Sequence, residues 1–68
     1  MATFVIFRDT AGYYRWRLVA SNGQKIATSG EAFDSKSNAE RSARLVREYA
    51  PSASIVDESK AGLRGLFR

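Results

Sequence analysis

The stretch from Tyr13 to Gly30, YYRWRLVASNGQKIATSG, decides the fold of this 68-residue chain. Asn22-Gly23 lies at its centre, and this pair is the strongest short-range sign of a β-hairpin, because a type I′ turn needs positive φ at both central positions. Residues 24–29 supply the returning strand, with Ile26 as its apolar anchor to the core. The sequence therefore predicts two antiparallel strands joined at Asn22-Gly23.

The strand before this turn has two chemically different faces. Side chains of a strand point alternately to opposite sides, so a period of two sorts them by face. One face carries Tyr14, Trp16, Leu18 and Ala20, and the other carries Tyr13, Arg15, Arg17 and Val19. The first set is suited to a core, and the second set is suited to a surface.

Another strand is predicted over residues 3–8 (TFVIFR), where β-branched and aromatic residues dominate. Its register depends on the turn over residues 9–12. A plain four-residue loop and a bulged turn differ by one residue, and such a slip moves every side chain to the opposite face. The plain loop places Val5 and Phe7 toward the core, and the bulged turn, which we favour, places Phe4 and Ile6 there.

A single helix is predicted from Ser37 to Ala50, after a connection in which Phe33 anchors residues 30–35 to the core. Ser37 and Glu40 match the S-x-x-E capping box, in which each side chain satisfies a free amide at the helix start, and Pro51 ends the helix. The inward face at helical spacing is Ala39, Ser42, Ala43, Val46, Tyr49 and Ala50, with Leu45 at its edge, and Arg41, Arg44, Arg47 and Glu48 point outward.

Residues 53–57 (ASIVD) are predicted to form a fourth short strand. The resulting β-β-β-α-β unit is an α+β fold, an antiparallel sheet with one helix packed on it. Residues 1–57 form one domain in this interpretation. Residues 58–68 form a loosely ordered basic tail, because they contain two glycines and no regular apolar period.

The composition excludes several functions and points to self-association. A chain of this length buries only about 60% of its unfolded surface, and such small cores usually need a disulfide, a structural metal or a partner subunit. The sequence has no cysteine and no histidine, so disulfides, ordinary zinc sites and histidine-activated nucleophiles are excluded within it. Glu31 and Asp34 are close carboxylates on a loop, but without a third ligand they predict neither catalysis nor a metal site. We expect a homodimer that is not an enzyme and has no cofactor or small-molecule ligand.

The same features predict a cytoplasmic protein that does not bind membranes. No apolar run approaches the roughly 20 residues that span a bilayer. The first residues, MATFVIF, lack the basic and apolar regions of a signal peptide. A chain without cysteine also suits a reducing compartment.

Two basic surfaces are candidate binding sites in a chain of net charge +4. Tyr13, Arg15 and Arg17 interleave cations with an aromatic ring on the exposed sheet face, a pattern that can hold phosphates and stack bases. Arg41, Arg44 and Arg47 form a helical stripe that can follow a phosphate backbone. Ordinary solvated faces account for both patterns as well, with Glu40–Arg44 as an i, i+4 ion pair. Nucleic acid is therefore the second candidate partner, after a second copy of the chain.

Five short segments occur in one known family in this order and spacing: Phe4 to Ile6, Tyr14 to Leu18, Asn22 to Ala27, Ser29 to Phe33, and Ser35 to Glu40. The match continues to Val46 and covers most of residues 3–57. In it the chain resembles the YegP-like family of small bacterial proteins, as a single-unit member. The family commonly has Gly-Ile where this chain has Ser42-Ala43, and a small residue at Leu45.

The resemblance implies β3-α-β units that pair, as tandem repeats or as two subunits, into one continuous sheet with exchanged C-terminal strands. By that analogy residues 53–57 join the sheet of a second copy. The family has no established activity, so the resemblance implies no catalytic residues.

Overall fold

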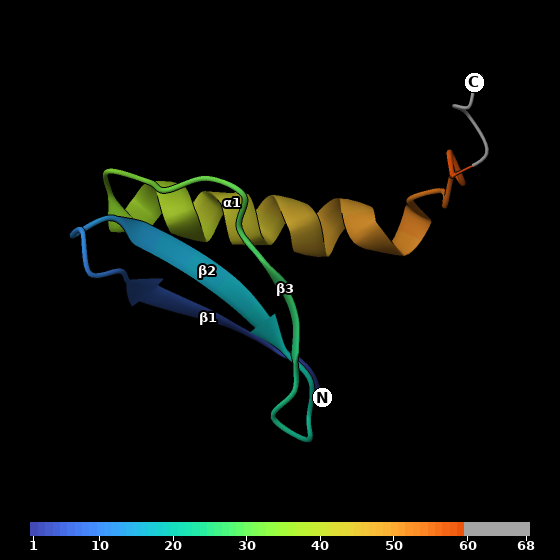
Figure 1. Ribbon diagram of the computed structural model, residues 1–68, viewed down its shortest axis with the longest axis horizontal. Helices are drawn as coiled ribbons and strands as arrows, with labels where there is room; N and C mark the ends of the chain where they lie inside the picture. Colours follow the sequence, from blue (N-terminus) through green and yellow to red (C-terminus); the bar gives the residue numbers. More distant parts are fainter. Residues whose placement is uncertain (60–68) are drawn as a thin grey trace.

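The computed structural model describes residues 1–59, which form a three-stranded antiparallel sheet and one helix. The elements are β1 (Thr3–Arg8), β2 (Tyr14–Val19), β3 (Lys25–Thr28), α1 (Lys36–Tyr49) and a 3₁₀ turn (Ala50–Ser52). The sheet order is β1-β2-β3, so β1 and β3 are its two edges. Figure 1 shows α1 lying over one face of the sheet and extending past it at its C-terminal end. The predicted α+β class, with one helix on an antiparallel sheet, is confirmed.

The register of β1 confirms that Phe4 and Ile6 face the core. Ile6 lies opposite Trp16, and Phe4 lies opposite Leu18. Arg8 is paired with Tyr14, so the turn contains five residues, 9–13, one more than the plain loop. Its fourth residue, Gly12, has a φ of +93°, a conformation that glycine adopts at no steric cost.

The second hairpin is confirmed, but its turn is of a different type from the prediction. The Gly23 amide donates to the Ala20 carbonyl (2.9 Å), and the Ala20 amide donates to the Gln24 carbonyl (2.8 Å). The loop therefore has three residues, 21–23, and it ends in a glycine with a φ of +89°. This is the arrangement of a three-residue hairpin with a glycine bulge, and not a two-residue type I′ turn.

A second irregularity explains why the prediction for Ile26 was wrong. Leu18 lies opposite Ala27, but Val19 lies opposite Lys25, so β3 contains one additional residue at Ile26. A β-bulge of this kind leaves the additional residue unpaired and bends the strand. The Ile26 side chain is 58% exposed and does not anchor β3 to the core.

The N-cap of the helix lies two residues before the predicted one. Ser35 is the N-cap, and its hydroxyl accepts a hydrogen bond from the Asn38 amide at 3.2 Å. The predicted Ser37–Glu40 capping box is therefore wrong, because Ser37 already lies inside the first turn. The end of α1 at Tyr49, just before Pro51, agrees with the prediction that proline stops the helix.

The core of the described chain is small. Its buried apolar side chains are Trp16, Ala39 and Ala43. Trp16 meets Phe4 edge-on, with ring centroids 5.3 Å apart, and its indole N–H donates to Ser42 Oγ at 2.9 Å. Tyr49 and Ala50, predicted to face inward, are exposed, because this end of α1 lies beyond the sheet (Figure 1).

The predicted fourth strand does not form within a single chain. Residues 53–58 have neither helix nor strand structure, and their side chains are exposed. A strand needs a neighbour for its hydrogen bonds, and this segment leads away from the sheet of its own chain (Figure 1). Most of the predicted tail, residues 60–68, lies outside the described residues.

The Trp16–Ser42 hydrogen bond gives a first testable prediction. Replacing Ser42 by Ala leaves a partly buried indole N–H without its acceptor, which should lower the free energy of unfolding by about 1–2 kcal/mol. Chemical denaturation followed by tryptophan fluorescence measures this loss. Ser37→Ala is the matched control, since Ser37 is an exposed serine of the same helix. Equal stability of the two variants would contradict a structural role for this bond.

Candidate functional site

The face of the sheet opposite the helix carries the first group of candidate residues. The β1–β2 register places Phe7 opposite Arg15 and Val5 opposite Arg17, on the side away from Trp16. No element of the described chain covers this side (Figure 1). We call it the outer sheet face, made of Thr3, Val5, Phe7, Arg15, Arg17 and Val19.

Both arginines of the outer sheet face are held in place. The Arg17 guanidinium lies over the Phe7 ring, 4.6 Å from its centroid. Arg15 Nε donates to Asp9 Oδ2 at 2.7 Å, which is the one ion pair among residues 1–59. The register places Arg15 and Arg17 on the same face of the sheet, as alternation along the strand predicts, and it adds Phe7, which the sequence analysis did not include among the candidate residues.

Asp9 organises the turn next to this face. Its Oδ1 accepts the amides of Ala11 (3.0 Å) and Tyr13 (2.9 Å), and its Oδ2 accepts Arg15. The hydrogen bond from Arg15, followed by that from the Tyr13 amide, holds the pKa of Asp9 below its ordinary value. Asp9 therefore fixes both the turn and the Arg15 side chain as long as it is ionised.

This pKa shift predicts an acid-sensitive turn. A carboxyl with a lowered folded-state pKa stabilises the fold above its unfolded pKa and loses that contribution as the pH falls through the folded pKa. The Tm of the native chain should thus exceed that of Asp9→Asn at pH 7, and the difference should shrink from about pH 5 downward. Thermal melts at equal protein concentration test this. A difference in Tm that is constant with pH would show that the Asp9 charge is not involved.

Tyr13 and Arg8 lie at the same end of the sheet. Tyr13 belongs to the turn and not to β2, and its side chain is exposed. Arg8 pairs with Tyr14 and lies over the Tyr14 ring at 5.1 Å, so it belongs to the helix side of the sheet. The structure therefore places Tyr13 beside Asp9 and Arg15, and it separates Arg8 from them.

The three helix arginines lie on an inclined row of the exposed helix surface. A step of three residues turns an α-helix by about 300°, so Arg41, Arg44 and Arg47 drift around the axis by about 60° per step. All three are exposed. Within residues 1–59 the predicted Glu40–Arg44 ion pair is not formed.

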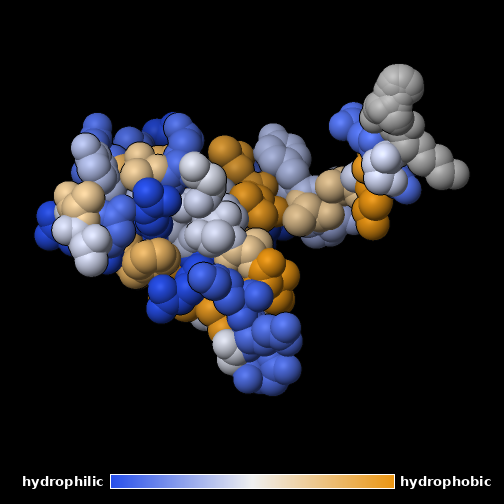
Figure 2. All heavy atoms as spheres, viewed as in Figure 1, coloured by the Kyte–Doolittle hydropathy of each residue, from blue (hydrophilic) through white to orange (hydrophobic). Residues whose placement is uncertain are grey.

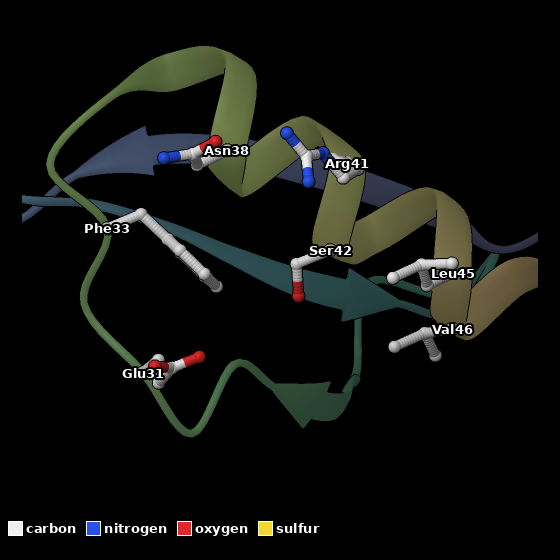
Figure 3. A pocket seen from close by; sticks show the side chains of 7 residues that line it. All are labelled: Glu31, Phe33, Asn38, Arg41, Ser42, Leu45 and Val46. Carbon is white, nitrogen blue, oxygen red and sulfur yellow. The ribbon is translucent and has the colours of Figure 1, made fainter.

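Arg41 instead lines a groove between α1 and the connection that precedes it. Residues 28 to 33 follow the edge of β2: Ser29 bonds to Trp16 (2.9 Å), and Phe33 exchanges two backbone bonds with Tyr14 (both 2.8 Å). The buried Ser29 hydroxyl donates to the Glu31 carbonyl (3.0 Å), which shapes the bulge between these contacts. Figure 3 shows Glu31 on the loop side and Arg41 on the helix side of the groove.

The groove has a volume of about 460 Å³ and is lined by Glu31, Phe33, Asn38, Arg41, Ser42, Leu45 and Val46. Glu31 is the one carboxylate among these residues, so the structure does not bring Glu31 and Asp34 together there. Across the described residues, no group of three His, Cys, Asp or Glu side chains could hold a metal ion. The groove offers mixed polar and apolar contacts, but it has no paired acid and base.

The segment after the helix is the third feature. Ile55 is 100% exposed and Val56 is 74% exposed. Figure 2 shows apolar side chains on this segment and along the part of α1 that precedes it. Asp57 ends the segment in a local turn, where its Oδ1 accepts the amide and the hydroxyl of Ser59. These two hydrogen bonds lower the pKa of Asp57.

The fold and these surfaces define a small α+β domain with one helix on an open antiparallel sheet. Residues 9–57 match the family described as "Domain of unknown function (DUF1508)". The chain belongs to this family, which is consistent with the YegP-like resemblance.

Three relatives illustrate the match. A "UPF0339 protein" of Treponema denticola is 41% identical over 54 residues, which are 79% of this chain and 91% of the relative. An NMR structure of a protein from Haloferax volcanii has a TM-score of 0.77 and 43% identity, covering 82% of this chain and 93% of that one. An NMR structure of a protein from Agrobacterium tumefaciens has a TM-score of 0.68 and 33% identity, covering 87% and 94%.

These comparisons support the fold and correct the range of organisms. Relatives occur in archaea as well as in bacteria, so the description of the family as bacterial was too narrow. The family has no known function. In addition, none of the helices within residues 1–59 has the length and apolar character that crossing a membrane requires.

Proposed function

We propose that this protein is a non-enzymatic homodimer that acts as a structural or interaction module, in which residues 53–57 of each chain join the sheet of the other. The observation that carries the proposal is the exposure of Ile55 and Val56 on a segment that contacts no sheet of its own chain. Leaving two such side chains in water forgoes about 1.5–3 kcal/mol for each.

The small core supports the same proposal. Three buried apolar side chains in the described residues are few for a stable domain. Further apolar side chains remain exposed at the free end of the helix and on β3, among them Leu45, Tyr49 and Ile26. A second copy of the chain can cover such surfaces. In a twofold dimer each contact between the chains occurs twice, because the two chains contribute the same surface.

The edge at β1 is the better acceptor for the added strand. β1 is six residues long and regular, whereas β3 has four residues and a bulge. Among the described residues β1 pairs on one side only, with β2. A regular edge with free amides and carbonyls is the ordinary template for strand addition. Location in the cytoplasm is part of this proposal, because a cysteine-free chain suits a reducing compartment.

Isotope-filtered NMR on a mixture of labelled and unlabelled chains tests the exchange directly. The proposal predicts contacts between chains from the Ile55 and Val56 methyl groups to residues of β1. Contacts between chains that involve only the outer sheet face, or contacts from Ile55 and Val56 to their own chain alone, would contradict it.

A further inference from the structure

The outer sheet face has an uneven charge that the dimer does not explain. Its charged side chains, Arg15 and Arg17, are both basic, and Lys25 extends from β3 opposite Val19 on the same side. The acidic group nearest to them in the fold is Asp9, which is bound to Arg15. We propose that this face binds single-stranded nucleic acid, with phosphates on Arg15 and Arg17 and bases stacked on the Arg17–Phe7 pair and on Tyr13.

Arg17 is prepared for such a ligand. Its guanidinium is stacked 4.6 Å from the Phe7 centroid, which fixes the flat group and reduces the entropy lost when a ligand binds. Within the described residues it makes no hydrogen bond or ion pair, so its five donors remain free for phosphate oxygens. The guanidinium face turned away from Phe7 can stack on a base.

Arg15 is fixed in a different way. Arg15 Nε donates to Asp9 Oδ2 at 2.7 Å. This single contact leaves the two terminal amino groups of the Arg15 guanidinium free. Both carboxylate oxygens of Asp9 are occupied, Oδ1 by the turn amides and Oδ2 by Arg15. Asp9 therefore positions Arg15, and the lone pairs of its carboxylate are largely used in hydrogen bonds within the fold.

The spacing and shape favour an extended single strand. Arg15 and Arg17 are two residues apart on one strand, which separates their Cα atoms by about 6.8 Å, comparable with the spacing of successive phosphates along a single strand. The face combines arginines with aromatic rings, and such rings stack on the faces of unpaired bases, whereas a duplex presents only base edges in its grooves. An acidic polypeptide would engage the arginines without using Phe7 or Tyr13. The site lies within one chain and does not depend on the dimer.

Fluorescence anisotropy of a labelled single-stranded RNA of about twelve nucleotides tests the proposal on the full chain. Two variants remove the same charge from different faces: Arg15→Gln/Arg17→Gln on the sheet and Arg44→Gln/Arg47→Gln on the helix. We expect the affinity to fall at least tenfold in the sheet variant and less than twofold in the helix variant. Phe7→Leu, which keeps both arginines, should weaken binding about fivefold because it removes the ring that holds the Arg17 guanidinium in place.

The dependence on salt provides an independent readout. Two phosphate contacts to a single strand predict a slope of about −1.4 in log K against log salt, and this slope should approach zero in the sheet variant. Thermal melts of all variants confirm folding. The proposal is overturned by a lack of binding at micromolar protein in low salt, or by equal losses in the two arginine variants. It is also overturned if polyglutamate or the matched duplex competes as well as unlabelled single strand.

Discussion

A chain in which Ile55 and Val56 are both replaced by Asp should have half the native mass in solution. In the dimer the added strand would place both side chains against the partner's sheet, one on each face, whereas in the isolated chain they are exposed, so the substitution acts on association and not on the fold of the monomer. The side chain on the helix side is the buried one, and losing its burial in both chains of the dimer removes about 3 kcal/mol or more, which raises the dimer dissociation constant by about a hundredfold or more.

The matched control places the same two charges elsewhere. Ala32→Asp/Ser37→Asp adds two carboxylates at exposed positions of the connection and the first helical turn, and it should leave the dimer intact. Light scattering coupled to size exclusion measures both masses. A native mass for the Ile55→Asp/Val56→Asp variant would show that this segment does not contribute to the interface.

Replacing Trp16 by Ala should unfold the domain under native conditions. Trp16 is 6% exposed, meets Phe4 edge-on and donates to Ser42 Oγ, so it joins β1, β2 and α1. Truncating a buried tryptophan costs about 3–5 kcal/mol, and a domain of this length has only about 3–10 kcal/mol in total. Circular dichroism should therefore show loss of the cooperative melt at low protein concentration.

Two further measurements make this prediction specific. Trp16→Phe keeps most of the apolar volume and loses only the indole hydrogen bond, so it should retain a cooperative melt at a lower Tm. Because association stabilises the folded state by mass action, higher protein concentration should partly restore the fold of Trp16→Ala. A Trp16→Ala melt within a few degrees of the native Tm would contradict the central role of this side chain.

The sequence pattern predicted the elements whose signals are local. Alternation along β2 placed Trp16 on the core side and Arg15 on the outer side, and the structure agrees. The bulged first turn, which places Ile6 opposite Trp16, was also predicted correctly, because Asp9 and Gly12 are both suited to an irregular turn. Helical spacing identified Ala39 and Ala43 as core residues.

The errors arose where the outcome depends on contacts between elements. Ser35 and Ser37 both suit an N-cap, and the choice between them is set by the pairing of Phe33 with Tyr14, which fixes where the connection ends. Ile26 is exposed at a bulge between Lys25 and Ala27, which depends on the pairing of β3 with β2. The exposure of Tyr49 reflects a helix longer than the sheet it covers, which helical periodicity does not reveal.

The candidate site, too, was predicted only where it depends on local pattern and not on contacts between elements. The face shared by Arg15 and Arg17 follows from alternation within one strand. Phe7 beneath Arg17 depends on the register between two strands, and that register was open between two alternatives. Arg41 was assigned to a helical stripe, but it lines a groove whose other wall is a loop.

The central claim is that two chains complete this domain, and the mass of the native protein in solution tests it most directly. Light scattering coupled to size exclusion, over a range of micromolar concentrations, should give twice the 7.5 kDa of one chain. A mass of 7.5 kDa that does not change with concentration would contradict the account.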